Sequence, residues 1–220
     1  MRLGQHFLVE KLYVDEVVSL TERRLRPLIE IGGGKGSITR ELQPDAVLEL
    51  DIDLARFLEA QGFSVVVGDA RSSPLRARQV VSSLPYYITF DFLESVSLDE
   101  EIMKLVLILQ KDVVDKLLRY STYVSFLVNL AFRVDPKSVI PPQAFEPRPK
   151  VYSQIVVLDR IRAVGEREAK ILKCLSRYRN KTLRRAADLC DLSSESEERV
   201  RDFAPHRVTE LLSAVGLSIV

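Results

Sequence analysis

The sequence predicts an α/β protein: a doubly wound sheet followed by a small all-helical C-terminal domain. Three observations support this fold class. Short β-rich runs alternate with helical patterns over the first two thirds of the chain. Most of these runs are continuously apolar, which is typical of parallel strands covered on both faces. From about residue 161 only helical patterns are left.

The elements follow in order along the chain. We expect strands at 27–33, 46–51, 64–69, 79–84 and 104–110, and helices at 36–43, 53–61, 89–97 and 112–132. The segment 138–160 is interpreted as two strands around a proline-stiffened loop, at the antiparallel end of the sheet. The first domain is expected to span 1–160 and the helical domain 161–220.

Composition limits the functional classes. The chain of 220 residues is 46% hydrophobic and 29% charged, which is ordinary for a globular protein. No apolar run reaches the ~20 residues that span a bilayer, and the first residues lack a signal-peptide pattern, so a cytoplasmic location is expected. Cys174 and Cys190 lack metal-ligand spacing, and we interpret them as small core residues; with only two histidines, no metal site is expected.

The glycine-rich stretch "LIEIGGGKGSIT" (28–39) is the clearest functional signal. A strand that runs into glycines and then a helix lets the main chain approach a ligand and offers free N–H groups to it. The pattern predicts a nucleotide-like cofactor without saying which. It is not a phosphate-binding P-loop, because Lys35 stands at the wrong place.

Two carboxylates follow the next two strands. Glu49 lies near the end of the second strand, where it can accept hydrogen bonds from ribose hydroxyls, and Asp69 ends the third, where it can accept from an adenine amine. Either alone would be read as a helix cap or a surface residue. Together with the glycine-rich loop they surround the crevice in which open α/β sheets bind ligands.

The fourth strand ends in "SSLPYY" (82–87). An adenine exocyclic amine is a poor nucleophile, and two hydrogen-bond acceptors would help its nitrogen become tetrahedral. A carbonyl turned outward at a proline bend is one such acceptor, a polar side chain just before it is another, and an aromatic ring just after it can stack on the base. The plain alternative is a strand-to-helix turn with a core tyrosine.

Basic residues cluster although the net charge is only +1. The stretch "RYRNKTLRR" (177–185) holds five basic residues and no acidic one, and "RRLR" (23–26) and "RSSPLRAR" (71–78) are also basic. Any one cluster fits a solvated helix face, but three of them favour a phosphate-binding surface.

These motifs together resemble the KsgA-type small-subunit ribosomal RNA adenine dimethyltransferases, over about residues 3–160. "GQHFL" (4–8) resembles the family's N-terminal cofactor-lid motif. "EIGGGKGSIT" is similar to its glycine-rich motif, with Gly33 where proline is usual. "LELD", "GDA", "SLPYYIT", "LILQKDVVDKLL" (107–118) and "AFEPRPKVYS" (144–153) follow in the family's order, and "RNKTLRRA" (179–186) resembles its basic C-terminal helix.

The resemblance implies a Rossmann-like methyltransferase that uses S-adenosyl-L-methionine, without a metal, to dimethylate the exocyclic amines of two adjacent adenosines near the 3′ end of small-subunit ribosomal RNA. It implies a role in small-subunit biogenesis, with that RNA or the immature small ribosomal subunit as partner, no membrane, and a monomeric enzyme. The implied cofactor-binding residues are Gln5, His6, Leu8, Gly32, Gly34, Glu49, Asp69, Ala70 and Ser83; the catalytic ones are Ser83, Leu84, Pro85, Tyr86 and Phe145; the RNA-binding ones are Arg179, Lys181, Arg184 and Arg185.

Two departures from the family keep alternatives open. Ser83 stands where the family usually has asparagine, and the C-terminal domain is shorter than usual. One alternative is an RNA-binding ribosome assembly factor with weak or vestigial methyltransferase activity. Another is a large-subunit ribosomal RNA adenine methyltransferase, against which "GQHFL" argues; a third, a DNA adenine methylase, fits the Phe145 segment poorly.

Overall fold

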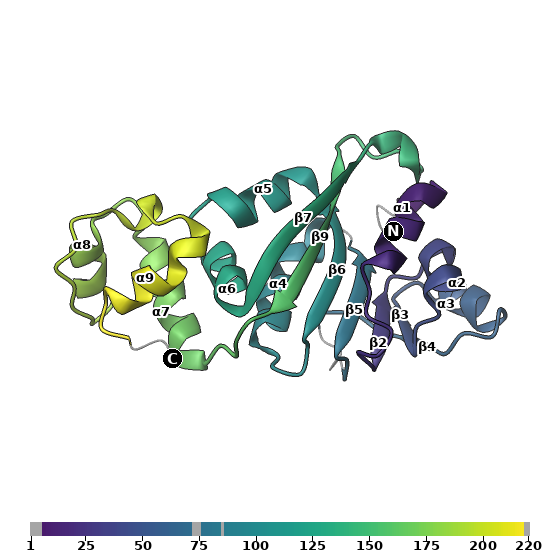
Figure 1. The fold of residues 1–220 in the computed structure, drawn as a ribbon, viewed down its shortest axis with the longest axis horizontal. Helices are drawn as coiled ribbons and strands as arrows, with labels where there is room; N and C mark the ends of the chain where they lie inside the picture. The colour runs from purple at the N-terminus through teal and green to yellow at the C-terminus, as the bar shows by residue number, and fades with distance from the viewer. Residues whose placement is uncertain (1–5, 72–75, 85, 218–220) are drawn as a thin grey trace. The chain divides into compact units, whose positions relative to one another are not determined.

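The structure is a computed structural model that describes residues 6–71, 76–84 and 86–217, with Tyr86 described by its main chain only. Its strands and α-helices follow in chain order in Figure 1: β1 Phe7–Leu8, α1 Lys11–Ser19, β2 Leu28–Ile31, α2 Ser37–Leu42, β3 Ala46–Glu49, α3 Ile52–Glu59, β4 Val65–Val67, β5 Gln79–Ser83, α4 Thr89–Leu98, β6 Lys104–Gln110, α5 Lys111–Arg119, α6 Tyr123–Ala131, β7 Phe132–Ile140, β8 Phe145–Glu146, β9 Ser153–Arg160, α7 Glu166–Arg177, α8 Leu183–Asp188 and α9 Val208–Ser213. Among the described helices, none is long and apolar enough to cross a membrane.

The main sheet has seven strands in the order β4-β3-β2-β5-β6-β9-β7. Strands β2 to β6 pair in parallel, as their continuous apolar runs predict, and β9 pairs antiparallel with β6. From β2 the chain first builds outward through β3 and β4, and then returns to build through β5 and β6 on the other side. The carboxyl ends of β2 and β5 therefore flank the topological switch point, where open α/β sheets bind ligands.

Residue contacts divide the chain into two units. Unit 1 comprises Met1–Phe92, Glu101–Lys111 and Asp135–Asp159; unit 2 comprises Leu93–Glu100, Asp112–Val134 and Arg160–Val220. Unit 2 contains the expected C-terminal domain, 161–220, together with two earlier segments. The functional division into a methyltransferase domain at 1–160 and an RNA-docking domain at 161–220 stays a prediction.

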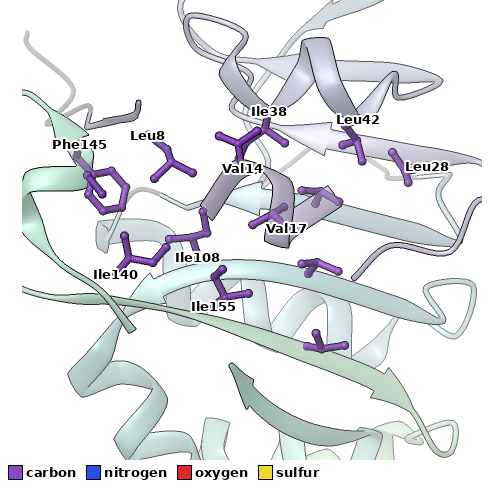
Figure 2. Packing of buried hydrophobic residues seen from close by; sticks show 14 residues of the cluster. Leu8, Val14, Val17, Leu28, Ile38, Leu42, Ile108, Ile140, Phe145 and Ile155 are labelled. Atoms are coloured by element: carbon purple, nitrogen blue, oxygen red, sulfur yellow. The ribbon is translucent and has the colours of Figure 1, made fainter. Parts of the chain in front are cut away.

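One core cluster of unit 1 packs two helices against the sheet (Figure 2). Val14 and Val17 lie three positions apart on α1, which places both on one helix face, and they join Ile38 and Leu42 of α2. Strand residues such as Ile108 complete the cluster. Fully burying one such side chain contributes about 1.5–3 kcal/mol. The cluster therefore stabilises the packing of α1 and α2 against the strands.

Two expected elements differ from the structure. The single helix expected at 112–132 is two helices, α5 and α6, because Thr122 caps the second: its hydroxyl oxygen accepts from the Ser125 N–H at 3.3 Å. The strand expected after residue 138 begins at Phe132 and includes Pro136. β7 is an edge strand, which is where a sheet accepts a proline.

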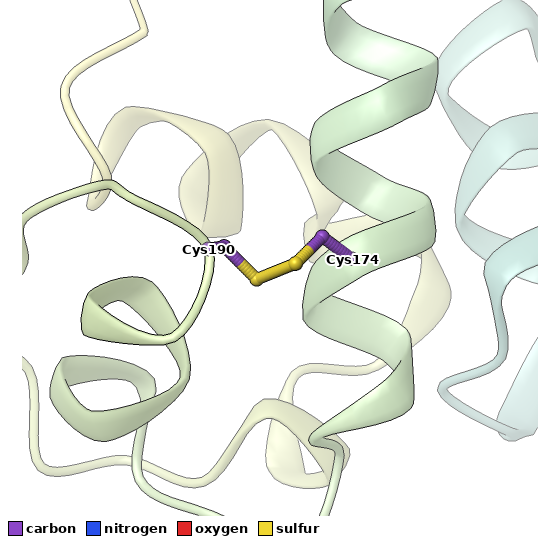
Figure 3. Close-up of a disulfide and its surroundings, with 2 residues drawn as sticks. All are labelled: Cys174 and Cys190. Carbon is purple, nitrogen blue, oxygen red and sulfur yellow. A yellow bond between two sulfur atoms is a disulfide. The ribbon is translucent and has the colours of Figure 1, made fainter.

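The interpretation of the two cysteines as separate core residues was wrong. Cys174 on α7 and Cys190 just after α8 form a disulfide, with their Cα atoms 5.9 Å apart (Figure 3). The cause is the turn between α7 and α8, which brings two positions 16 residues apart into bonding distance. Spacing along the chain carries no such information.

Removing this disulfide should destabilise unit 2. For the double variant Cys174→Ser/Cys190→Ser we expect the free energy of unfolding to fall by about 2–4 kcal/mol, because the closed loop restricts the unfolded chain. Urea unfolding followed by circular dichroism is the suitable measurement, since the chain has no tryptophan. A dithiol reductant should shift the parent's midpoint and leave the double variant unchanged; identical midpoints for reduced and oxidised parent would contradict a structural role.

Candidate active site

A pocket in unit 1 opens at the carboxyl ends of β2, β3, β4 and β5. It brings together most of the residues that the sequence singled out. Gln5 and Pro85 lie outside the described residues, as does the side chain of Tyr86. The predicted residues that line the pocket are His6, Leu8, Gly32, Gly34, Glu49, Asp69, Ala70, Ser83, Leu84 and Phe145.

Glu49 joins the glycine-rich loop to the end of β3. One of its carboxylate oxygens accepts from the Gly34 N–H at 2.9 Å, and the other accepts from the Asp51 N–H at 3.0 Å. Asp51 in turn caps α3, since its side chain accepts from the N–H groups of Asp53 and Leu54. Each oxygen keeps a second lone pair, so the buried Glu49 carboxylate can accept further hydrogen bonds from a ligand.

Gly34 lets the N-terminal strand lie directly on the loop. Its φ is +53°, and a Cβ there would stand 2.8 Å from the Phe7 ring. Any side chain would therefore push Phe7 away and strain the main chain as well. The Lys35 ammonium lies 5.1 Å from the centroid of the same ring, a cation–π contact that adds to the closure.

Strand β1 pairs with β8, which joins two motifs far apart in the sequence. Leu8 lies opposite Phe145 and Phe7 opposite Glu146 in this antiparallel pair. His6 Nδ1 lies 2.7 Å from the Pro147 carbonyl oxygen. Through this pairing, His6 and Leu8, which were predicted to line the cofactor, and Phe145, which was predicted to lie at the target base, line the same pocket.

Asp69 is held by Arg71, the first residue of the basic stretch 71–78, a pairing that the sequence analysis did not predict. Arg71 Nε donates to both Asp69 oxygens at 3.1 Å, and Arg71 Nη2 donates to one of them at 2.6 Å. The Arg71 guanidinium holds the pKa of the Asp69 carboxyl below its ordinary value. The carboxylate is therefore charged and fixed before any ligand arrives.

The two serines that precede Leu84, Ser82 and Ser83, have different surroundings. The Ser82 hydroxyl is buried and donates to the Ile31 carbonyl at 2.8 Å, which ties β5 to β2. Ser83 is partly buried and lines the pocket beside Leu84. Tyr87, which we did not single out, lines the pocket while 56% of its surface is exposed.

Glu30 is a second lining residue that the sequence analysis missed. It is 2% exposed, and its Oε2 has no hydrogen-bond partner among the described residues. Burial, reinforced by the neighbouring Glu49 carboxylate, raises the pKa of Glu30 to about 7. The sequence did contain a signal for Glu30, because it is a carboxylate inside the otherwise apolar strand "LIEI". A carboxylate is rarely buried without a hydrogen-bond or charge partner, which a ligand can supply.

The predicted RNA-binding residues lie in unit 2. Arg179 and Lys181 precede α8, while Arg184 and Arg185 lie on its exposed side. This segment is held by main-chain hydrogen bonds, such as Leu183 N–H to the Glu198 carbonyl at 2.8 Å. In the part of the chain that the structure describes, no group of three or more His, Cys, Asp or Glu could hold a metal ion.

The buried Glu30 carboxyl should make stability depend on pH. Its pKa is raised from 4.5 to about 7 on folding, so its contribution is fully present below pH 4.5 and is lost as pH rises through 7. Glu30→Gln should therefore gain stability relative to the parent across this window, by about 2–3 kcal/mol at most. The measurement is urea unfolding at several pH values, with exposed Glu59→Gln as control; a stability difference independent of pH would refute the raised pKa.

Comparison with known proteins identifies the family. A family model described as "Ribosomal RNA adenine dimethylase" matches residues 1–178. The ribosomal RNA small subunit methyltransferase A of Saccharophagus degradans is 32% identical, with 96% of this chain and 89% of that protein covered. Its counterpart from a Synechococcus species is 27% identical, with 99% and 88% covered.

Two solved structures share the fold. The 23S rRNA methyltransferase ErmE has a TM-score of 0.72 and 20% identity, covering 96% of this chain and all of that one (100%). A dimethyladenosine transferase from Plasmodium falciparum has a TM-score of 0.69 and 20% identity, covering 82% and 74%. Since the family model matches residues 1–178 of the 220, the chain belongs to the ribosomal RNA adenine dimethylase family.

Proposed function

We propose that this protein dimethylates the exocyclic amines of two adjacent adenosines near the 3′ end of small-subunit ribosomal RNA, as a step in small-subunit biogenesis. As a member of its family it is an S-adenosylmethionine-dependent methyltransferase. The observation that carries the proposal is that the glycine-rich loop, Glu49, Ser83 and Phe145 all line one pocket. The residues proposed to bind the cofactor and those proposed to bind the target adenine would therefore lie next to each other.

The lining residues fit the polar groups of S-adenosylmethionine. The unpartnered Oε2 of Glu30 would accept from the ammonium of the methionine part, which would also favour the charged carboxylate. The open lone pairs of Glu49 would accept from the ribose hydroxyls. Asp69, held charged by Arg71, would accept from the adenine amine, with Ala70 against the ring.

The reaction needs positioning rather than a covalent enzyme intermediate. S-adenosylmethionine supplies an electrophilic methyl group on a sulfonium. Ser83 and the carbonyl groups around Pro85 would accept hydrogen bonds from the target amine, and so favour a tetrahedral nitrogen. Tyr86 and Phe145 would hold the adenine ring by stacking, and the rate would come from alignment and from these acceptors.

Substrate preference separates the proposal from its alternatives. The purified protein would be incubated with radiolabelled S-adenosylmethionine and unmodified small subunits, large-subunit RNA or DNA. We expect label in small-subunit adenosines, recovered as the dimethylated nucleoside. Label in large-subunit RNA or DNA alone would contradict the proposal, and binding to small subunits without transfer would favour the assembly-factor alternative suggested by Ser83.

Cofactor affinity should depend on Glu49. Glu49→Ala removes a charged acceptor and loosens Gly34, so we expect S-adenosylmethionine to bind at least about tenfold more weakly, because such bonds contribute ~1.5–3 kcal/mol. Calorimetric titration of the folded variant is the measurement. Exposed Asp53→Ala on α3 is the matched control; unchanged affinity in Glu49→Ala would remove this residue from the cofactor seat.

Ser83 should act on turnover and not on cofactor affinity. We expect Ser83→Ala to lower methyl transfer, because the amine loses an acceptor, while Ser83→Asn keeps or raises it. Single-turnover kinetics and cofactor titration of each variant separate the two effects. If Ser83→Ala transfers methyl groups at the parent's rate, the acceptor function rests on the Pro85 region alone.

The basic segment should contribute RNA affinity. We expect weaker binding to immature small subunits when four basic residues are neutralised, namely Arg179, Lys181, Arg184 and Arg185. The slope of log affinity against log salt concentration should fall by up to about 3, because fewer phosphate contacts release fewer counterions on binding. The ion pairs of Arg184 with Glu197 and of Arg185 with Asp188 are exposed and can yield to phosphates.

The matched control neutralises four exposed arginines outside the three basic clusters, Arg56, Arg119, Arg133 and Arg167. Cofactor affinity should stay at the parent's value in both variants. A basic-segment variant that binds small subunits as tightly as the parent at low and moderate salt would exclude the segment as an RNA-docking element.

A further inference from the structure

Tyr87 has an unusual position for a residue that lines a pocket. The side chains beside it, Leu84 and Ile88, are 3% and 6% exposed, whereas Tyr87 is 56% exposed. The 3-10 turn Tyr86–Ile88, just after β5, directs it to the mouth of the pocket. An aromatic ring that borders both a pocket and solvent offers a stacking face to whatever extends out of that pocket.

Arg71 stands next to this ring and is already immobilised. Its guanidinium carbon lies 5.9 Å from the Tyr87 ring centroid, close to the ~6 Å limit of a cation–π contact. The three side-chain bonds to Asp69 use the Nε and Nη2 hydrogens on one edge of the guanidinium. Of its five N–H donors, those directed away from Asp69 can bind an anion, and little side-chain entropy is lost in doing so.

We propose that Tyr87 and Arg71 form a second nucleotide subsite, which holds the nucleotide next to the target adenosine. Its base would stack on the Tyr87 ring, and its phosphate would accept from Arg71. This inference rests on the proposed function, since a single-stranded RNA must place one base in the pocket and so leaves its neighbour at the mouth. It gives a role to two residues to which the family resemblance assigned none.

The subsite would also connect the two ligands. Asp69, proposed to accept from the cofactor's adenine, is bonded to Arg71, and Arg71 in turn faces Tyr87. Loss of the Tyr87 ring should affect RNA more than the cofactor, because that ring is 56% exposed at the border of the pocket. Loss of the Arg71 guanidinium should affect RNA and, through Asp69, the cofactor as well.

The test uses a short single-stranded oligoribonucleotide with 2-aminopurine beside the target adenosine, because stacking quenches its fluorescence. Titrated with the parent protein, the probe should be quenched. Tyr87→Ala should abolish the quenching and weaken binding about fivefold or more, while Tyr87→Phe, which keeps the ring, should restore both. Arg71→Gln should weaken binding and lower the salt slope by about 1.

Tyr120→Ala is the matched control, because Tyr120 is 52% exposed and lies in unit 2. Quenching and affinity in Tyr87→Ala equal to the parent's, or no quenching by the parent, would overturn the subsite. If the parent transfers methyl groups to RNA and Tyr87→Ala has the same KM for RNA as the parent, the subsite is overturned while the proposed function stands. Quenching that depends on Tyr87, without methyl transfer, would support the subsite and reject the proposed function.

Discussion

The Glu49 carboxylate is the constraint on which the site depends. A buried charge is tolerated only when it is well hydrogen-bonded, and here the donors are the main-chain N–H groups of Gly34 and Asp51. These two bonds fix the glycine-rich loop against the end of β3 and position the start of α3. They also place the charge close enough to Glu30 to help raise its pKa. The proposed cofactor site is therefore held in place by the chain's own hydrogen bonds.

Closure of the pocket depends on a second long-range contact. β1 is only two residues long, yet its pairing with β8 and the contact between Phe7 and Gly34 hold it over the loop. The same pairing brings Phe145 to the pocket wall. Phe145, proposed to stack on the target base, is thus positioned by β1, the strand proposed to cover the cofactor. The proposed cofactor site and the proposed target-base site therefore depend on the same strand pairing.

The sequence was sufficient for the parallel strands and for the residues at their ends, because continuous apolar runs and turn glycines are local signals. It was insufficient where a contact depends on how a turn folds or on which rotamer a side chain adopts. The Cys174–Cys190 bond depends on how α7 and α8 turn, and the Asp69–Arg71 pair depends on rotamers. Pro136 misled because only a strand's place at the sheet edge makes proline acceptable within it.

The most direct measurement is an NMR titration of the isotope-labelled protein with S-adenosylhomocysteine, which has the cofactor's shape without its methyl group. A pre-built seat held by Glu49 predicts saturable shifts at the Gly34 and Asp51 amides and at Arg71, with the amides of 166–213 unaffected. Saturable shifts that map outside the pocket, or none at millimolar ligand, would contradict the account.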